Sequence, residues 1–158
     1  METRLTVNDI AHTLEGDGER PLIWALHDEL GLTRTGFHCL QGHCGSCTIL
    51  VDGIPQRACV TPVKVLEGSR VQTIEGVCAA GHDVCAAFSE AGLLNCTKCS
   101  SGQVMCAVAQ LRADASVDGE TLMDRLAENI CYCLRYRDIR RALERAISVS
   151  ATGANTNP

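Results

Sequence analysis

The sequence contains few aromatic residues and no long apolar segment. Its 158 residues include one Trp, two Tyr and two Phe, so large aromatic side chains contribute little to a core. No run of about eighteen apolar residues is present, which excludes a conventional transmembrane helix. Residues 1–30 carry charged side chains throughout and show no apolar segment typical of a secretory signal. We therefore expect a cytoplasmic protein by default, with export to the periplasmic side as part of a complex as the alternative.

Basic clusters and catalytic motifs are absent as well. The formal net charge is −5 at pH 7, and Lys and Arg are not concentrated in any segment. Nothing therefore favours nucleic acid or an anionic membrane surface as a partner. No phosphate-binding glycine loop, dinucleotide fingerprint or Ser–His–acid pattern is visible. We expect that this chain makes and breaks no substrate bonds by itself.

Cysteine, in contrast, is abundant. The chain has eleven cysteines, and an odd number in a reducing compartment argues against a disulfide framework. Two folding units of about 75 residues would each be marginally stable. Bonds between metals and thiolates can supplement cores that are short of large side chains. The composition therefore favours metal-binding thiols.

The most informative stretch runs from Cys39 to Cys59. Its first three cysteines follow the spacing C-x4-C-x2-C, and eleven residues separate the third from the fourth. This is the plant-type spacing for a [2Fe–2S] cluster. A disulfide pair, a zinc site or idle thiols are the alternatives, but zinc sites commonly use two C-x2-C hooks. The expected ligands of this first cluster are Cys39, Cys44, Cys47 and Cys59.

Other residues in this stretch bear on the same site. Gly42 and Gly45 alternate with the thiols and allow positive φ, which can direct backbone N–H groups at sulfur. His38 and His43 flank the thiols and could replace one of them as in a Rieske centre, although four thiols are already in register.

A second set of thiols lies in the C-terminal half. It combines a C-x2-C and a C-x-C pair with thirty-one residues between the pairs. The spacing alone fits zinc as well as a cluster. Ser100 and Gln103 resemble a capping box, which would start a helix just after Cys99 and expose that thiol to the positive end of the helix dipole. The members of the set are Cys96, Cys99, Cys131 and Cys133.

Residue patterns divide the chain into a strand-rich first half and a helical second half. Strands are expected at 4–7, 10–14, 48–51, 54–60, 63–66 and 70–74, and helices at 21–30, 82–92, 102–112, 121–128 and 137–149. This is an α+β fold with a boundary near Gly76. We expect a mixed-sheet domain over 1–76, a four-helix domain over 77–149 and a disordered tail over 150–158.

Three cysteines fall outside both sets. Cys78, Cys85 and Cys106 are expected to pack as free thiols in the core, because free cysteine is among the most buried residues. Cys78 and Cys85 are seven residues apart, which also suggests a third metal site if one helix spans both. A redox-sensing role would need one of these three thiols to be accessible and reactive.

Several short motifs give the chain a family resemblance. Both thiol sets, together with Thr73-Ile74-Glu75-Gly76, Gly102-Gln103-Val104-Met105 and Asn129-Ile130-Cys131-Tyr132-Cys133, resemble the iron–sulfur subunit of the molybdenum hydroxylases, the xanthine oxidase and aldehyde oxidoreductase family. The resemblance implies a β-grasp ferredoxin domain followed by a four-helix domain, with one [2Fe–2S] cluster in each.

The resemblance also implies partners and a direction of electron flow. The cluster of the helical domain would lie near the molybdopterin cofactor of a large catalytic subunit. The cluster of the ferredoxin domain would pass electrons to a separate flavin or cytochrome subunit. The complex would oxidise an aldehyde or an N-heterocycle.

The chain departs from the family pattern at several positions. Asn95 stands where the family has a Gln that borders the pterin, so the resemblance places Asn95 near the molybdopterin with a shorter side chain. Tyr132 replaces an Arg and His38 replaces a Gly. The alternative hypothesis is a free-standing ferredoxin-type electron carrier with a structural zinc in its helical half.

Overall fold

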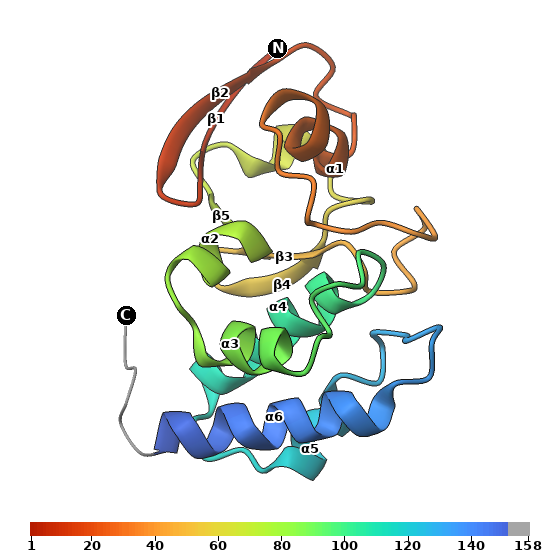
Figure 1. Cartoon of the computed structure of the whole chain (residues 1–158). Helices are drawn as coiled ribbons and strands as arrows, with labels where there is room; N and C mark the ends of the chain where they lie inside the picture. The colour runs from red at the N-terminus through yellow and green to blue at the C-terminus, as the bar shows by residue number, and fades with distance from the viewer. Residues whose placement is uncertain (152–158) are drawn as a thin grey trace.

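The computed structural model describes residues 1–151 (Figure 1). The last helix, α6 (Tyr136–Ala151), includes the first two residues of the expected tail over 150–158. Residues 150 and 151 are therefore helical, and the rest of the predicted tail lies outside the described part of the chain. None of the described helices is both long and apolar enough to cross a membrane.

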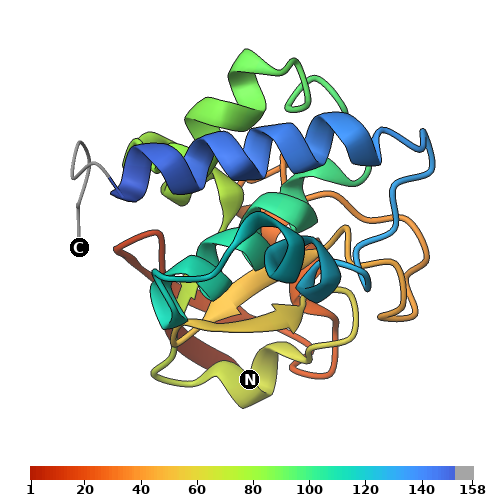
Figure 2. The same ribbon diagram turned by 90° about the horizontal axis from the view of Figure 1, so that it is seen from below.

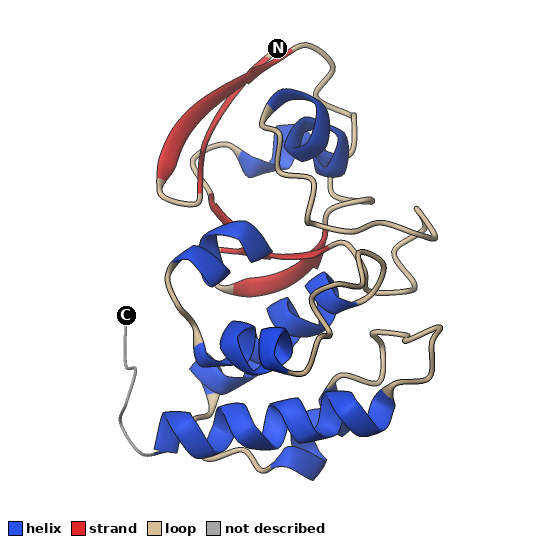
Figure 3. Cartoon of the chain, viewed as in Figure 1, coloured by secondary structure: helices blue, strands red, loops and turns tan. Residues whose placement is uncertain are grey.

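A five-stranded mixed sheet forms the N-terminal half (Figure 3). The strands lie in the order β2-β1-β5-β3-β4; β1 and β5 are parallel and the other neighbours are antiparallel. Two-residue turns with positive φ at Asn8-Asp9 and Asp52-Gly53 close the two hairpins. The strands are β1 (Glu2–Val7), β2 (Ile10–Glu15), β3 (Thr48–Val51), β4 (Ile54–Arg57) and β5 (Arg70–Gln72).

One helical segment packs on this sheet. It begins after Pro21 as α1 (Leu22–Trp24) and continues as the π-helical η1 (Ala25–Glu29). Leu22, Ile23 and Leu26 are completely buried in a core that they share with the inward-facing residues of β1. The helix expected at 21–30 is thus present, with its second half wound more loosely than an α-helix.

The expected strand at 63–66 is wrong. This segment is the 3₁₀-helix η2 (Val63–Leu66), which follows Pro62. Val63 and Leu66 are buried while Val65 is 59% exposed. Residues three apart share a face in a 3₁₀-helix, so both Val63 and Leu66 can point toward the sheet. In a strand, side chains three residues apart would point to opposite faces.

Five helices form the C-terminal half. The four expected helices are present with shifted ends, and an additional short helix occupies the segment where the last strand was expected to end. Figure 3 shows most of these helices below the sheet, with the additional short helix beside the strands. The helices are α2 (Ile74–Ala79), α3 (Asp83–Glu90), α4 (Ser100–Ala113), α5 (Gly119–Arg125) and α6.

Helix α4 connects the two halves. It contacts β3 and β4 on one side and α2, α3 and α5 on the others, and nearly all of its side chains are buried. Figure 2 shows it between the sheet and the long helix α6. It begins directly after Cys99, as expected, but not through a capping box. The Ser100 hydroxyl donates to the carbonyl of Cys96, and no side chain caps the helix.

The prediction of free thiols is wrong for two of the three remaining cysteines. Cys78 and Cys85 form a disulfide with a Cα–Cα distance of 5.4 Å. They are therefore neither the free core thiols that we expected nor the third metal site that their spacing suggested. The chain reverses between α2 and α3 at Gly81, whose φ is 76°, so the two cysteines lie on different helices that face each other. Cys106 on α4 is a buried thiol, as predicted.

Candidate metal-binding loops

The first thiol loop connects η1 to β3. Positive φ values at Leu40, Gly42 and Gly45 curl its backbone. The β3–β4 hairpin returns the fourth thiol to the loop, because the N–H of Ala58 donates to the carbonyl of Cys47 at 3.0 Å. Interactions between the sulfurs link Cys39 with Cys44, and Cys47 with both Cys44 and Cys59. All four thiols expected in this set are thus brought together.

The environments of these thiols differ strongly. Burial acts to raise the pKa of Cys39, but backbone N–H groups outweigh it and lower the pKa to about 6. The amides of Gln41 and Cys44 each lie 3.4 Å from its sulfur. Burial, with the neighbouring thiols of Cys59 and Cys44, raises the pKa of Cys47 to about 12. The loop therefore stabilises negative charge at its rim and excludes water at its base.

The second thiol set is assembled from two separate connections. Cys96 and Cys99 lie between α3 and α4 with their sulfurs 3.9 Å apart, and Cys131 follows α5. Burial, reinforced by the sulfurs of Cys131 and Cys96, raises the pKa of Cys99. In the metal-free chain, burial among these sulfurs therefore outweighs the position of Cys99 at the start of α4. Burial opposes a low pKa at Cys96 too, but the N–H groups of Cys99 and Lys98 outweigh it and lower that pKa.

The fourth member of the second set is placed differently. Cys133 is exposed, whereas Cys99 and Cys131 are buried, and within residues 1–151 its sulfur makes no contact with the other three. The chain does turn here, as two cysteines so close in sequence would require, with Leu134 at a φ of 56°. Cys131 is anchored by its N–H, which donates to the Tyr136 hydroxyl at 3.0 Å.

The donor chemistry of both loops suits iron and sulfide. Within residues 1–151 no three Cys, His, Asp or Glu side chains form a group that could hold a single metal ion. Each loop nevertheless offers soft thiolate ligands, and backbone N–H groups point at the sulfurs of Cys39 and Cys96. Such N–H groups stabilise the ligated sulfurs of an anionic cluster. The residues present therefore fit [2Fe–2S] clusters.

The two thiol loops lie next to each other. Figures 1 and 2 both show the loop before β3 and the loop before α6 on the same side of the molecule. The N–H of Ile130 donates to the carbonyl of Cys44 at 3.1 Å, and the rings of His38 and Tyr132 contact each other at an interplanar angle of 54° with centroids 4.7 Å apart. His38 is therefore a contact between the loops. These contacts were not visible in the sequence, where eighty-four residues separate Cys44 from Asn129, although the motif from Asn129 to Cys133 marked the right segment.

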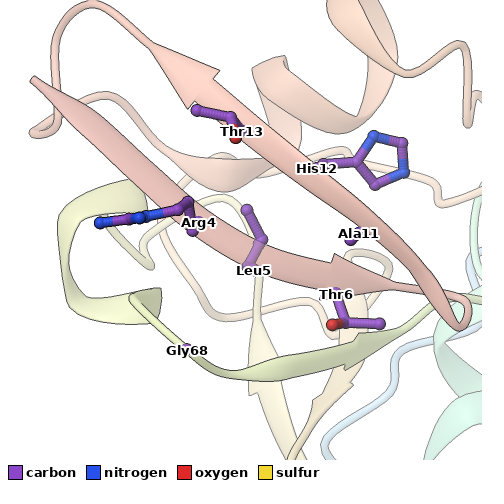
Figure 4. A pocket seen from close by; sticks show the side chains of 7 residues that line it. All are labelled: Arg4, Leu5, Thr6, Ala11, His12, Thr13 and Gly68. Atoms are coloured by element: carbon purple, nitrogen blue, oxygen red, sulfur yellow. The ribbon is translucent and has the colours of Figure 1, made fainter.

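Asn95 lies at the edge of an open cavity. The cavity has a volume of about 420 Å³ and is also lined by Arg34, His82 and the disulfide between Cys78 and Cys85. Asn95 is exposed and immediately precedes Cys96. A second cavity, of about 290 Å³, lies along β1 and β2 without any thiol (Figure 4). None of the predicted metal ligands lines this cavity.

Family models match both halves of the chain. One, described as a 2Fe-2S iron-sulfur cluster binding domain, matches residues 5–73. The other, described as a [2Fe-2S] binding domain, matches residues 73–144.

Characterised proteins of similar length match as well. The alpha subunit of isoquinoline 1-oxidoreductase from Brevundimonas diminuta is 33% identical over 84% of this chain and 88% of its own length. One of the subunits of nicotinate dehydrogenase from Pseudomonas putida is 34% identical over 81% of this chain and 83% of its own length.

Solved structures share the fold. A chain of quinoline 2-oxidoreductase from Pseudomonas putida 86 has a TM-score of 0.87 at 29% identity, covering 97% of both chains. Aldehyde oxidoreductase from Desulfovibrio gigas has a TM-score of 0.86 at 32% identity. That match covers 98% of this chain but only 18% of the other, so the same fold also occurs as one part of a much longer polypeptide.

Proposed function

Because the chain belongs to the family of iron–sulfur subunits of the molybdenum hydroxylases, it is the electron-transfer subunit of an oxidoreductase, and we propose the following ligands for its two clusters. Cys39, Cys44, Cys47 and Cys59 bind one [2Fe–2S] cluster. Cys96, Cys99, Cys131 and Cys133 bind the other. The proposal includes Cys133 because it lies two residues after Cys131, at a point where the chain turns through the positive φ of Leu134.

The residues of the chain prepare these sites for electron transfer. A bound [2Fe–2S] cluster accepts and releases one electron. The amides directed at Cys39 and Cys96 stabilise thiolates and tune the potential. Burial of Cys47 and Cys99 excludes water, which keeps the reorganisation of solvent small. The hydrogen bond between Ile130 and Cys44 supports close spacing of the two sites.

We further propose where the partners lie. A large molybdopterin-binding subunit contacts the helical half, and Asn95 in its open cavity lies near the molybdopterin. The ferredoxin half, with a domain boundary near Gly76, faces a separate flavin or cytochrome acceptor. The relatives act on isoquinoline, nicotinate and aldehydes, so the substrate of the complex is an aldehyde or an N-heterocycle. Assembly in the cytoplasm suits the eight proposed ligand thiols, which must stay reduced until the clusters form.

The observation that carries the proposal is the pairing of two thiol loops joined by a backbone hydrogen bond. The test is metal analysis and electron paramagnetic resonance of the purified, dithionite-reduced chain. We expect about four irons, no zinc and two distinct binuclear signals. Two irons with one zinc would instead support a free-standing ferredoxin-type carrier. Copurification with a large molybdenum-containing subunit tests the partner.

A further inference from the structure

A buried polar side chain joins the two thiol loops. Asn129 is only 3% exposed and lies two residues before Cys131. Its Nδ2 donates to the sulfur of Cys106 on α4 at 3.0 Å, and its backbone carbonyl accepts from Nε2 of Gln103 at 3.3 Å. The loop that carries Cys131 is thereby fixed to α4.

The same side chain reaches the first thiol loop. Oδ1 of Asn129 lies 3.5 Å from the hydroxyl of Thr48, which in turn donates to the carbonyl of Gly45 at 2.7 Å. Gly45 has a φ of 79°, and a Cβ at this position would overlap the amide of Asn129. The backbone between Cys44 and Cys47 therefore packs directly against the Asn129 side chain.

The surroundings hold this amide in one orientation. Arg57 on β4 contacts the Thr48 hydroxyl and lies 3.4 Å from a carboxylate oxygen of Glu128. In this orientation Nδ2 donates to the sulfur of Cys106 at 3.0 Å, and Oδ1 lies beside the Thr48 hydroxyl, whose hydrogen is donated to the carbonyl of Gly45. A buried amide that is hydrogen-bonded at Nδ2 and packed against Gly45 fixes geometry more strictly than an apolar side chain of equal size would.

We propose that Asn129 is a positioning residue for electron transfer between the two clusters. Its side chain fixes the Cys131 loop against the Cys44–Cys47 loop and so sets the separation and relative orientation of the two iron centres. Electron transfer slows steeply as the distance between centres grows, and magnetic coupling between two reduced centres weakens in the same way. This role rests on the proposed function, because it requires a cluster in each loop.

A second asparagine in the same chain provides a matched control. Asn8, in the β1–β2 turn, joins that turn to the start of α2: its Nδ2 donates to the hydroxyl of Thr73 at 2.9 Å, and its Oδ1 accepts from the N–H of Thr73 at 2.9 Å. It has no contact with either thiol loop among residues 1–151. Asn8→Ala thus removes two hydrogen bonds of an asparagine amide without touching the proposed positioning role.

The experiment compares Asn129→Ala, Asn129→Asp and Asn8→Ala in the full chain with both clusters assembled. Electron paramagnetic resonance of dithionite-reduced samples gives the two cluster signals and their coupling. Photoreduction gives the rate of electron exchange between the clusters, and thermal unfolding gives Tm. We expect Asn129→Ala to keep both signals, to weaken their coupling and to slow exchange by ~10-fold, the usual scale for losing a supporting contact.

The controls separate positioning from stability. Asn8→Ala should lower Tm and leave coupling and exchange unchanged. Asn129→Asp preserves the shape but replaces the donor to Cys106 by an oxygen and brings an ionisable carboxyl into a buried site, so it should also weaken the coupling, and it replaces the Ala variant if that chain does not assemble. Unchanged coupling and exchange in the Asn129 variants would overturn the positioning role. A single binuclear signal in the unsubstituted protein would overturn the proposed function itself, and the positioning role with it.

Discussion

The two thiol sets of this protein are assembled in different ways. In the N-terminal half, one glycine-containing loop supplies three thiols and the adjoining β3–β4 hairpin supplies the fourth. In the helical half, two connections separated by α4 and α5 must meet, and Cys133 stays exposed while Cys131 is buried. The first site is therefore defined by local backbone geometry, and the second by the packing of helices.

Both sets nevertheless share one electrostatic pattern. Each has one thiol near the rim whose pKa is lowered by backbone N–H groups, Cys39 and Cys96, and one buried thiol whose pKa is raised, Cys47 and Cys99. The C-x2-C hook alone does not produce this pattern, because Cys39 lies outside the hook of its loop and Cys96 begins the other. The two sites therefore share a pattern of thiol pKa values, although different elements of the chain supply their thiols.

The largest expected effect comes from removing a buried thiol of the locally built site. Cys47→Ser replaces a thiolate ligand by a weak one in a loop whose structure depends on the metal. We expect the loss of one of the two binuclear signals and about half of the iron, with the second signal retained. Iron analysis and electron paramagnetic resonance provide the measurement. Cys106→Ser, a buried cysteine outside both sets, should keep both signals; loss of both signals in Cys47→Ser would show that the sites do not assemble independently.

The exposed thiol of the helical half gives the next largest effect. If Cys133 completes the second set, Cys133→Ser removes the binuclear signal of the helical half and leaves that of the ferredoxin half. The same two measurements apply, with Cys96→Ser as the positive control. Retention of both signals at full intensity in Cys133→Ser would exclude Cys133 as a ligand.

The sequence predicted the local site better than the assembled one. The C-x4-C-x2-C spacing and Gly42 and Gly45 indicated both the site and its curled backbone, because those features lie within one loop. The bridge through Asn129 was missed, since hydrogen bonds to Cys106 and Thr48 arise only when α4 packs on β3. The short helix α2 was missed for a related reason: its few residues carry too weak a helical period to be recognised alone.

The disulfide was missed because the prediction relied on properties of the whole chain. An odd cysteine count and a reducing compartment gave no reason to pair Cys78 with Cys85, and only the reversal at Gly81 brings them together. The pKa of Cys99 in the metal-free chain also depends on tertiary packing. Its position before α4 was visible in the sequence, but its burial beside two other sulfurs, which raises the pKa, was not.

The disulfide gives the helical half a stabilising link that the ferredoxin half lacks among the described residues. Cys78→Ala combined with Cys85→Ala should lower the free energy of unfolding by about 2 kcal/mol, as the loop-closure model gives for so short a loop. Thermal unfolding with and without a dithiol measures this effect. Reductant should lower the Tm of the unsubstituted metal-free chain and leave the double variant unchanged. Equal sensitivity in both would show that the disulfide contributes no stability.

A loss of similar size is expected where α4 approaches the first thiol loop. A Cβ at position 102 would overlap the carbonyl of Gly45, which belongs to the backbone of the first thiol loop. Gly102→Ala should therefore cost about 1–3 kcal/mol of unfolding free energy despite the better helix propensity of alanine. Gly119→Ala is the matched control, because its Cβ meets the flexible side chain of Glu144 at 2.8 Å. Chemical denaturation of both variants measures the difference, and equal values would contradict the close approach of α4.

The smallest effect concerns thiol reactivity in the metal-free chain. Backbone N–H groups overcome the effect of burial and lower the pKa of Cys39 to about 6, whereas burial raises that of Cys47 to about 12. A thiol reacts as its thiolate, so alkylation of Cys39 should rise with pH through about 6 and level off near neutrality. Cys47 should stay protonated and react slowly up to about pH 9. Peptide mapping after brief iodoacetamide treatment across this range gives both profiles. Parallel profiles for the two thiols would mean that the rim and the base of the loop do not differ in electrostatic environment.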